Sequence, residues 1–198
     1  MRVVRADQAQ FDVRGEISEI FADGFSQWLG YFSKDKNKIA AAFAHMFILN
    51  QFYVAVSEGK VVGIAACTNG ISHSVKLDRT ELRKHLGIYK GSLAGVFLKK
   101  EFEAPYINFP PGAGSIEFIG TSVEYRGKGI ASQLVQYILE HTPYQIYLIE
   151  EVADTNIPAM KLYQKLGFEV YKSKPIPVKR AEKIGINQIV SLKYTKND

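Results

Sequence analysis

A short glycine-bearing loop between an apolar strand and an amphipathic helix constrains the fold of this chain most. Residues 115–123 read SIEFIGTSV, a run whose apolar and aromatic side chains suit a half-buried strand. From Ile130 the apolar spacing becomes helical, through Leu134 and Ile138. The loop between them, 125–129, reads YRGKG. Because its glycines leave the first helical amides open at the positive end of the helix dipole, the pattern predicts an anion site.

Composition indicates an ordinary globular domain. With 198 residues, 46% hydrophobic and 23% charged, we expect one domain with a full core. The single cysteine, Cys67, leaves no intrachain disulfide and no cysteine-based metal site. The N-terminus lacks the apolar segment of a signal peptide, and the longest apolar run, 39–49, is too short to span a membrane. We therefore expect a cytoplasmic protein with no membrane partner.

The net charge of +5 has two interpretations: a basic surface without a specific role, or attraction of an anionic ligand. Basic residues are not interleaved with aromatic residues, so no nucleic-acid partner is predicted. The four histidines, His45, His73, His85 and His141, have no metal-ligand spacing. We therefore expect no metal.

The periods of the apolar residues predict an alternation of strands and helices. Strands are expected at 3–5, 52–56, 61–67, 115–123, 145–152, 168–171 and 188–194. Helices are expected at 14–25, 35–50, from 130 onward and at 157–166. Between the third and fourth strands, the segment 68–114 predicts no strand but two helices, one capped by Asp78 and one over 91–103. Such a long connection is either a lid over a site or additional packing.

A second motif follows the predicted strand at 145–152. Asn156 is placed to cap a helix, with Pro158 in its first turn and Gly167 closing it. Tyr163 lies beside the packed face of this helix. From the residues alone, Tyr163 is either a core side chain or one that exposes its hydroxyl at an edge.

Together these motifs resemble the GNAT superfamily of N-acetyltransferases. Arg126-x-x-Gly129-x-Ala131 fits the acyl-CoA loop of that family, Gln/Arg-x-x-Gly-x-Gly/Ala. The segment 150–168 fits its later strand, Asn, and helix with Leu-Tyr ending at Gly-Phe. The motifs cover about 115–170, and the order of elements extends the resemblance to most of the chain. It implies a single α/β domain, 1–198, with a mixed sheet of about seven strands, helices on both faces and 68–114 as a helical insertion.

The resemblance also implies a binding mode for acetyl-CoA. Backbone amides of the loop would hold the pyrophosphate, the 119–121 backbone would pair with the pantetheine arm, and Asn156 would bond to that arm. A bulge near Gly120 would part its strand from the next and open a slot for the thioester. The implied contacts are Ile119, Gly120, Thr121, Arg126, Gly127, Lys128, Gly129, Ile130, Ala131, Ser132 and Asn156.

For the chemistry, the resemblance implies that Tyr163 protonates the departing CoA thiolate. The base that deprotonates the amine is Glu151, Glu117 or an ordered water, and these alternatives stay open. Strand alternation predicts that Glu150 and Glu151 point to opposite faces, so that only one of them points into the slot.

The expected function is transfer of an acetyl group from acetyl-CoA to a primary amine of a small molecule, by direct attack in a ternary complex. Two alternatives stay open: a non-catalytic CoA-binding module and a protein N-terminal acetyltransferase. Cys67, inside an apolar strand, is not expected to act as a nucleophile. The acceptor has no signature in the sequence, and a homodimer stays open.

Overall fold

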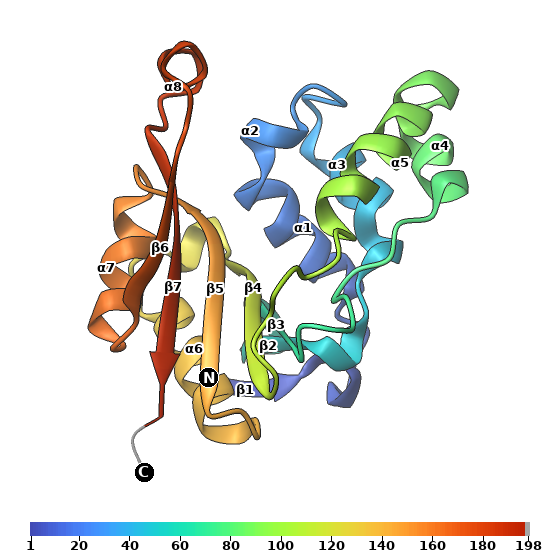
Figure 1. Ribbon diagram of the computed structural model, residues 1–198. Helices are drawn as coiled ribbons and strands as arrows, with labels where there is room; N and C mark the ends of the chain where they lie inside the picture. The colour runs from blue at the N-terminus through green and yellow to red at the C-terminus, as the bar shows by residue number, and fades with distance from the viewer. Residues whose placement is uncertain (197–198) are drawn as a thin grey trace.

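A seven-stranded sheet forms the centre of the protein (Figure 1). The computed structural model describes residues 1–196, except for the side chains of Gln27, Arg180 and Lys183. The strands are β1 (Arg2–Arg5), β2 (Phe52–Ser57), β3 (Lys60–Thr68), β4 (Ala113–Thr121), β5 (Ile146–Ala153), β6 (Glu169–Pro175) and β7 (Gln188–Thr195). Their order is β1-β2-β3-β4-β5-β7-β6. Only β4 and β5 are parallel neighbours, so the sheet is mixed, as predicted.

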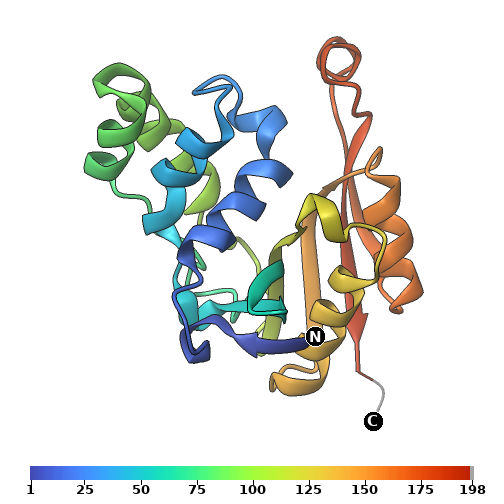
Figure 2. The same ribbon diagram turned by 180° about the vertical axis from the view of Figure 1, so that it is seen from behind.

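Helices cover both faces of this sheet, which confirms the predicted α/β class. They are α1 (Arg14–Gly24), α2 (Ser26–Leu29), α3 (Lys36–Phe43), α4 (Arg79–Leu86), α5 (Ile88–Phe102), α6 (Ile130–His141), α7 (Ile157–Lys165) and α8 (Val178–Ile184). Helices α1 to α5 lie on one side and α6 and α7 on the other, as Figure 2 shows from behind. Helix α8 tops a β6–β7 arm that projects beyond the other elements (Figure 1).

Two clusters of buried side chains attach the helices to the sheet. The α1–α3 core is rich in aromatic rings. The ring centroid of Phe21 on α1 lies 5.6 Å from that of Phe43 and 5.7 Å from that of Phe47, in tilted and edge-to-face arrangements. The α6–α7 core joins Leu134 and other residues of α6 to Tyr147 of β5. In the described part of the chain, the α1–α3 core takes residues from β2, β3 and β4 but none from β5, β6 or β7. On the side of the sheet that carries α1 to α5, strands β5, β7 and β6 therefore lie outside this core.

The predicted helix at 35–50 is wrong in its length. It begins as expected with Asp35, whose carboxylate accepts hydrogen bonds from two amides of the first turn, but α3 ends at Phe43. The guanidinium of Arg14 binds the carbonyl oxygen of Phe47 at 2.8 Å, and Phe47 forms a β-bridge with the insertion. These tertiary contacts hold the backbone of Phe47 in an extended conformation and stop the helix.

The sequence predicts no helix or strand between 172 and 187, but the structure has both there. Strand β6 continues beyond the predicted 168–171 to Pro175, and α8 follows. Gly185 closes α8 in a left-handed conformation. The β6–β7 connection is therefore a helical arm rather than a plain loop.

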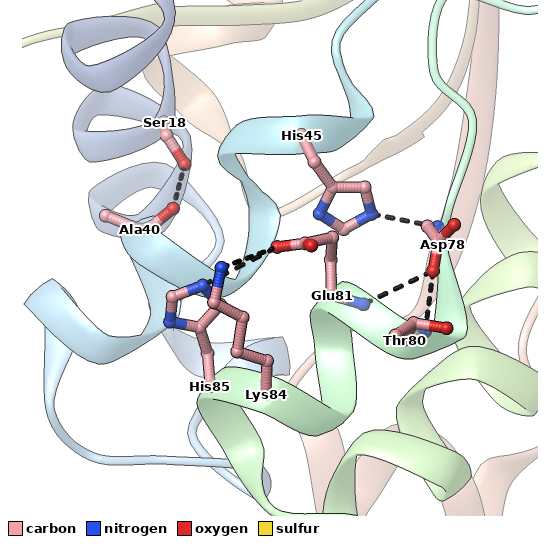
Figure 3. A network of polar contacts seen from close by, with 8 residues as sticks. All are labelled: Ser18, Ala40, His45, Asp78, Thr80, Glu81, Lys84 and His85. Carbon is pink, nitrogen blue, oxygen red and sulfur yellow. Dashed lines mark hydrogen bonds and ion pairs between the residues drawn. The ribbon is translucent and has the colours of Figure 1, made fainter.

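The predicted insertion contains two helices, α4 and α5, as expected. The carboxylate of Asp78 caps α4 by accepting hydrogen bonds from the amides of Thr80 at 2.6 Å and Glu81 at 3.2 Å. The amide of Asp78 in turn donates to Nε2 of His45 at 2.8 Å (Figure 3). His45 therefore ties the start of α4 to the segment that follows α3.

Candidate active site

The loop at 125–129 and the first turn of α6 present unpaired backbone amides. Gly127 and Gly129 have φ of 75° and 79°, a conformation that is costly for any residue with a Cβ. Gly129 is the last residue before α6 begins at Ile130. Within the described chain, the amides here that donate to no protein group are those of Gly127, Gly129, Ile130, Ala131 and Ser132. These donors, together with the α6 dipole, fit the pyrophosphate of acetyl-CoA.

The charged side chains of this loop are exposed. Arg126 and Lys128 both face solvent, and the Lys128 ammonium lies 4.5 Å from the centroid of the Tyr125 ring. Ile130 points the other way and is buried in the α6–α7 core. The loop therefore places two cationic side chains beside the unpaired amides, next to a buried apolar residue at the start of α6.

Strands β4 and β5 pair over three residues and then part. Ala113, Gly114 and Ser115 pair with Ile146, Tyr147 and Leu148, at a constant offset of 33 residues. Beyond Ser115, β4 forms no further pairs with β5. Ile119, Gly120 and Thr121 lie in this open stretch, where β5 does not pair with their backbone. That this backbone pairs with an extended ligand arm stays a prediction.

Both strands carry a bulge at the same level, just past the point where they part. Phe118 and Glu151 have φ of 50° and 57°, and the same offset of 33 relates them. The register shifts beside each of them, in the β3–β4 and β5–β7 ladders. The bulge predicted near Gly120 therefore falls at Phe118. Gly120 instead allows close packing, because a Cβ there would come within 3.0 Å of Ile20 on α1.

The β4 bulge turns two consecutive side chains to the α1–α5 side of the sheet. Ile116 and Ile119 belong to the α6–α7 core, whereas Phe118 packs in the α1–α3 core. Glu117 also faces this side, since its carboxylate accepts hydrogen bonds from hydroxyl groups of Ser74 at 2.7 Å, Thr68 at 3.5 Å and Tyr106. Three hydroxyl groups at the edges of the insertion or within it thus hold one carboxylate next to the open stretch.

Tyr106 is half-buried and packs against two other rings of the insertion. Its ring lies between those of His73 at 5.6 Å and Phe109 at 5.4 Å. Burial, together with the negative charge of Glu117, raises the pKa of Tyr106. The Tyr106 hydroxyl therefore remains a hydrogen-bond donor to Glu117 at neutral pH.

The β5 bulge gives Glu150 and Glu151 different surroundings. Ile149 and Val152 both enter the α6–α7 core, so regular strand alternation does not hold across the two glutamates. That only one of them points into the slot stays a prediction. The carboxylate of Glu150 accepts hydrogen bonds from hydroxyl groups of Tyr171 on β6 and Ser191 on β7. Glu151 is exposed and forms no hydrogen bond within the described chain.

Helix α7 supplies the other two predicted site residues. Asn156 is its N-cap, and its side-chain oxygen accepts a hydrogen bond from the Ala159 amide at 3.3 Å. Its side-chain NH₂ group has no partner in the described chain and is available to a ligand. Tyr163 is only 6% exposed, and burial raises its pKa to about 12. Its hydroxyl has no hydrogen-bond partner among the described residues, yet the oxygen is not fully enclosed.

The partners of Glu117 are functional candidates that sequence reasoning missed. Ser74, Tyr106 and Thr68 lie 43, 11 and 49 residues from Glu117 along the chain. Serine, threonine and tyrosine in a connection have many uses, so no local pattern marks them. Only the pairing of β3 with β4 and the path of the insertion bring these hydroxyl groups together.

The sheet order, the two-sided cover of helices and the loop before α6 define the class: a mixed α/β domain of the acyl-CoA N-acyltransferase fold. The profile of the Acetyltransferase (GNAT) family matches residues 16–168, most of the chain. This chain therefore belongs to the GNAT acetyltransferase family.

Solved structures agree on the fold. An N-acetyltransferase from Staphylococcus aureus Mu50 superposes with a TM-score of 0.63 at 19% identity, covering 98% of this chain and 100% of that one. The yncA protein of Salmonella typhimurium, solved with its cofactor acetyl-CoA, superposes with a TM-score of 0.54 at 12% identity. The match covers 100% of this chain and 95% of that one. A ribosomal-protein-alanine N-acetyltransferase from Brucella melitensis superposes with a TM-score of 0.55 at 14% identity. The match covers 99% of this chain and 100% of that one. At these identities, the likeness shows the fold alone.

Among curated proteins, no sequence matches this one. Within the described residues, no helix has the length and apolar character needed to cross a bilayer. In the same part of the chain, no three His, Cys, Asp or Glu side chains gather as metal ligands would.

Proposed function

We propose that this protein transfers an acetyl group from acetyl-CoA to a primary amine of a small molecule, by direct attack in a ternary complex. The observation that carries this proposal is the parting of β4 from β5, together with the five unpaired amides of the loop and the first turn of α6. The amides fit the pyrophosphate, and the open β4 backbone fits an extended pantetheine arm. The thioester would then lie between the two strands, next to Glu117.

The proposed reaction moves two protons and one acyl group. Glu117 takes a proton from the substrate ammonium, and the freed nitrogen lone pair attacks the thioester carbonyl carbon. An N–C bond forms, the C–S bond breaks, and the sulfur leaves as a thiolate. Tyr163 donates its phenolic proton to that sulfur. The nitrogen loses its second proton as the amide forms, and this proton restores the phenol of Tyr163 through water, while Glu117 returns the first proton to solvent. Acetyl-CoA supplies the activated acyl group, and the chain supplies the base, the acid and the positioning.

Glu117 is preferred to Glu151 as the base because of its surroundings. Its carboxylate is half-buried and held by three hydroxyl donors, so it has a fixed direction. Glu151 is exposed and has no such support. The insertion at 68–114 then has a defined role, since Ser74 and Tyr106 orient the base, whether or not it also closes over the acceptor.

The test is release of free thiol from acetyl-CoA in the presence of polyamines, amino acids, aminoglycosides or short peptides. We expect release with small amines, and a kcat lowered about a hundredfold or more by Glu117→Gln but only slightly by Glu151→Gln. A kcat lowered only by Glu151→Gln would show that Glu151 is the base. An unchanged kcat in both variants would show that water is the base. Binding of acetyl-CoA with no release for any amine would contradict the proposal and indicate a non-catalytic module.

A further inference from the structure

Glu150 is a second carboxylate at the level of Glu117 on the facing strand. The offset of 33 residues that relates the paired positions of β4 and β5 also relates Glu117 to Glu150. Each lies two residues beyond the last pair and one residue before a bulge, at Phe118 and Glu151. The two carboxylates therefore flank the opening between the strands, one on each wall.

Both carboxylates also face the same side of the sheet. Ile116 before Glu117, and Ile149 before Glu150, belong to the α6–α7 core, so both glutamates point away from that core. Ser191, which donates a hydrogen bond to Glu150, points to the same side. Its two neighbours on β7 belong to the α6–α7 core, so Ser191 itself faces away from that core. On this side, β5 lies outside the α1–α3 core and Glu150 keeps part of its surface exposed. A substrate that approaches Glu117 from this side therefore meets Glu150 as well.

Neither carboxylate is neutralised within the protein. Each accepts hydrogen bonds from a tyrosine and a serine, and neither forms an ion pair in the part of the chain that the structure describes. Two carboxylates that face one opening repel each other and favour a cation between them. Tyr163 is only 6% exposed and its hydroxyl has no hydrogen-bond partner among the described residues, so it is a further polar group that the protein leaves to a ligand.

We infer that Glu150 is a specificity-determining residue and that the acceptor carries a second cationic group besides its reacting amine. This inference rests on the proposed function. The reacting nitrogen gives its proton to Glu117 and must become neutral, so only one carboxylate is used by the reaction. The second cation pairs with Glu150, where the hydroxyl groups of Tyr171 and Ser191 hold the carboxylate in place. A basic diamine fits this arrangement, whereas an amino acid would bring its carboxylate against Glu150.

The test compares 1,4-diaminobutane with 4-amino-1-butanol, which replaces the second ammonium by a neutral hydroxyl. We expect wild-type kcat/KM to favour the diamine about tenfold, chiefly through KM. Glu150→Gln keeps an acceptor oxygen for Tyr171 and Ser191, and should lower the diamine value about tenfold while changing the aminobutanol value less than about twofold. Glu169→Gln, which removes the same charge from an exposed position on β6, should change neither value.

Two further results separate specificity from folding. Ser191→Ala removes a hydrogen bond but no charge, so the diamine preference should persist. Equal wild-type turnover of the two acceptors, or a Glu150→Gln loss that is equal for both, would overturn the inference and leave the proposed function standing. Binding of acetyl-CoA with no acetylation of either acceptor or of any other amine would overturn both.

Discussion

Tyr163 is the residue at which a catalytic role and a structural role are most easily separated. Its ring packs in the α6–α7 core, while its hydroxyl has no hydrogen-bond partner in the described chain. Tyr163→Phe should therefore change the free energy of unfolding by less than about 0.5 kcal/mol. It should lower kcat about a hundredfold or more, because the departing thiolate loses its acid. Equal kcat for the two proteins would contradict this role, and denaturant unfolding supplies the stability control.

Cys67 should be inert in the folded protein. It is buried in β3, and burial raises the pKa of its thiol to about 12. At pH 8 only about one thiol in ten thousand would be ionised. We expect a thiol-specific reagent to modify the protein only after denaturation, as intact mass would show. Rapid modification of the native protein would reopen the possibility of a cysteine nucleophile.

At the scale of elements, the glycine loop has a matched control elsewhere in the chain. Gly129 and Gly185 both have positive φ, and a Cβ on either would meet no atom within 4 Å. Either change to alanine should cost about 1 kcal/mol of stability through the backbone alone. Only Gly129→Ala should also weaken acetyl-CoA binding, because its Cβ and any backbone shift disturb the unpaired amides. Equal affinity of both variants, measured by calorimetry, would argue against the pyrophosphate site.

The insertion should act on the reaction through Glu117. Tyr106→Phe removes one donor to that carboxylate while keeping the ring between His73 and Phe109. We expect kcat to fall about tenfold with an unchanged KM for acetyl-CoA.

The control for this test is Tyr89→Phe, which removes the hydroxyl of an exposed tyrosine on α5. A Tyr106→Phe enzyme with lower stability but an unchanged kcat would show that Tyr106 is only a packing residue.

For the whole molecule, His45 links pH to stability. Its Nε2 accepts a hydrogen bond from the Asp78 amide, and its Nδ1 is enclosed with no hydrogen-bond partner within the geometric limits among the described residues. Burial lowers the pKa of His45, although Asp78 and Glu81 oppose this shift and His85 adds to it (Figure 3). A histidine whose folded pKa lies below its unfolded value of about 6.5 gives stability that is complete above that pH. This stability is lost as pH falls below it.

His45→Gln offers a side-chain oxygen to the Asp78 amide and does not titrate. Between pH 8 and pH 5, the wild-type free energy of unfolding should therefore fall more steeply than that of His45→Gln. Parallel curves from denaturant unfolding would show that His45 does not contribute to the pH dependence.

Much of the architecture was predictable because its signals are local. The glycines at 127 and 129, the change of apolar period at Ile130 and the Asn156 cap each act within a few residues, and all were confirmed. The bulges at Phe118 and Glu151 were not predictable at their positions, since a bulge depends on how neighbouring strands pair. The roles of Ser74, Tyr106 and Ser191 were missed for the same reason: long-range contacts create them.

The central claim is that acetyl-CoA and an amine meet in the opening between β4 and β5 and react directly. The most direct measurement is mass spectrometry of a reaction with isotope-labelled acetyl-CoA, with and without 1,4-diaminobutane. We expect labelled acetyl-diamine and free CoA in equal amounts, and an unlabelled protein whether or not the amine is present. A protein that becomes labelled without the amine would contradict direct attack. Bound acetyl-CoA that acetylates no amine would contradict the account as a whole.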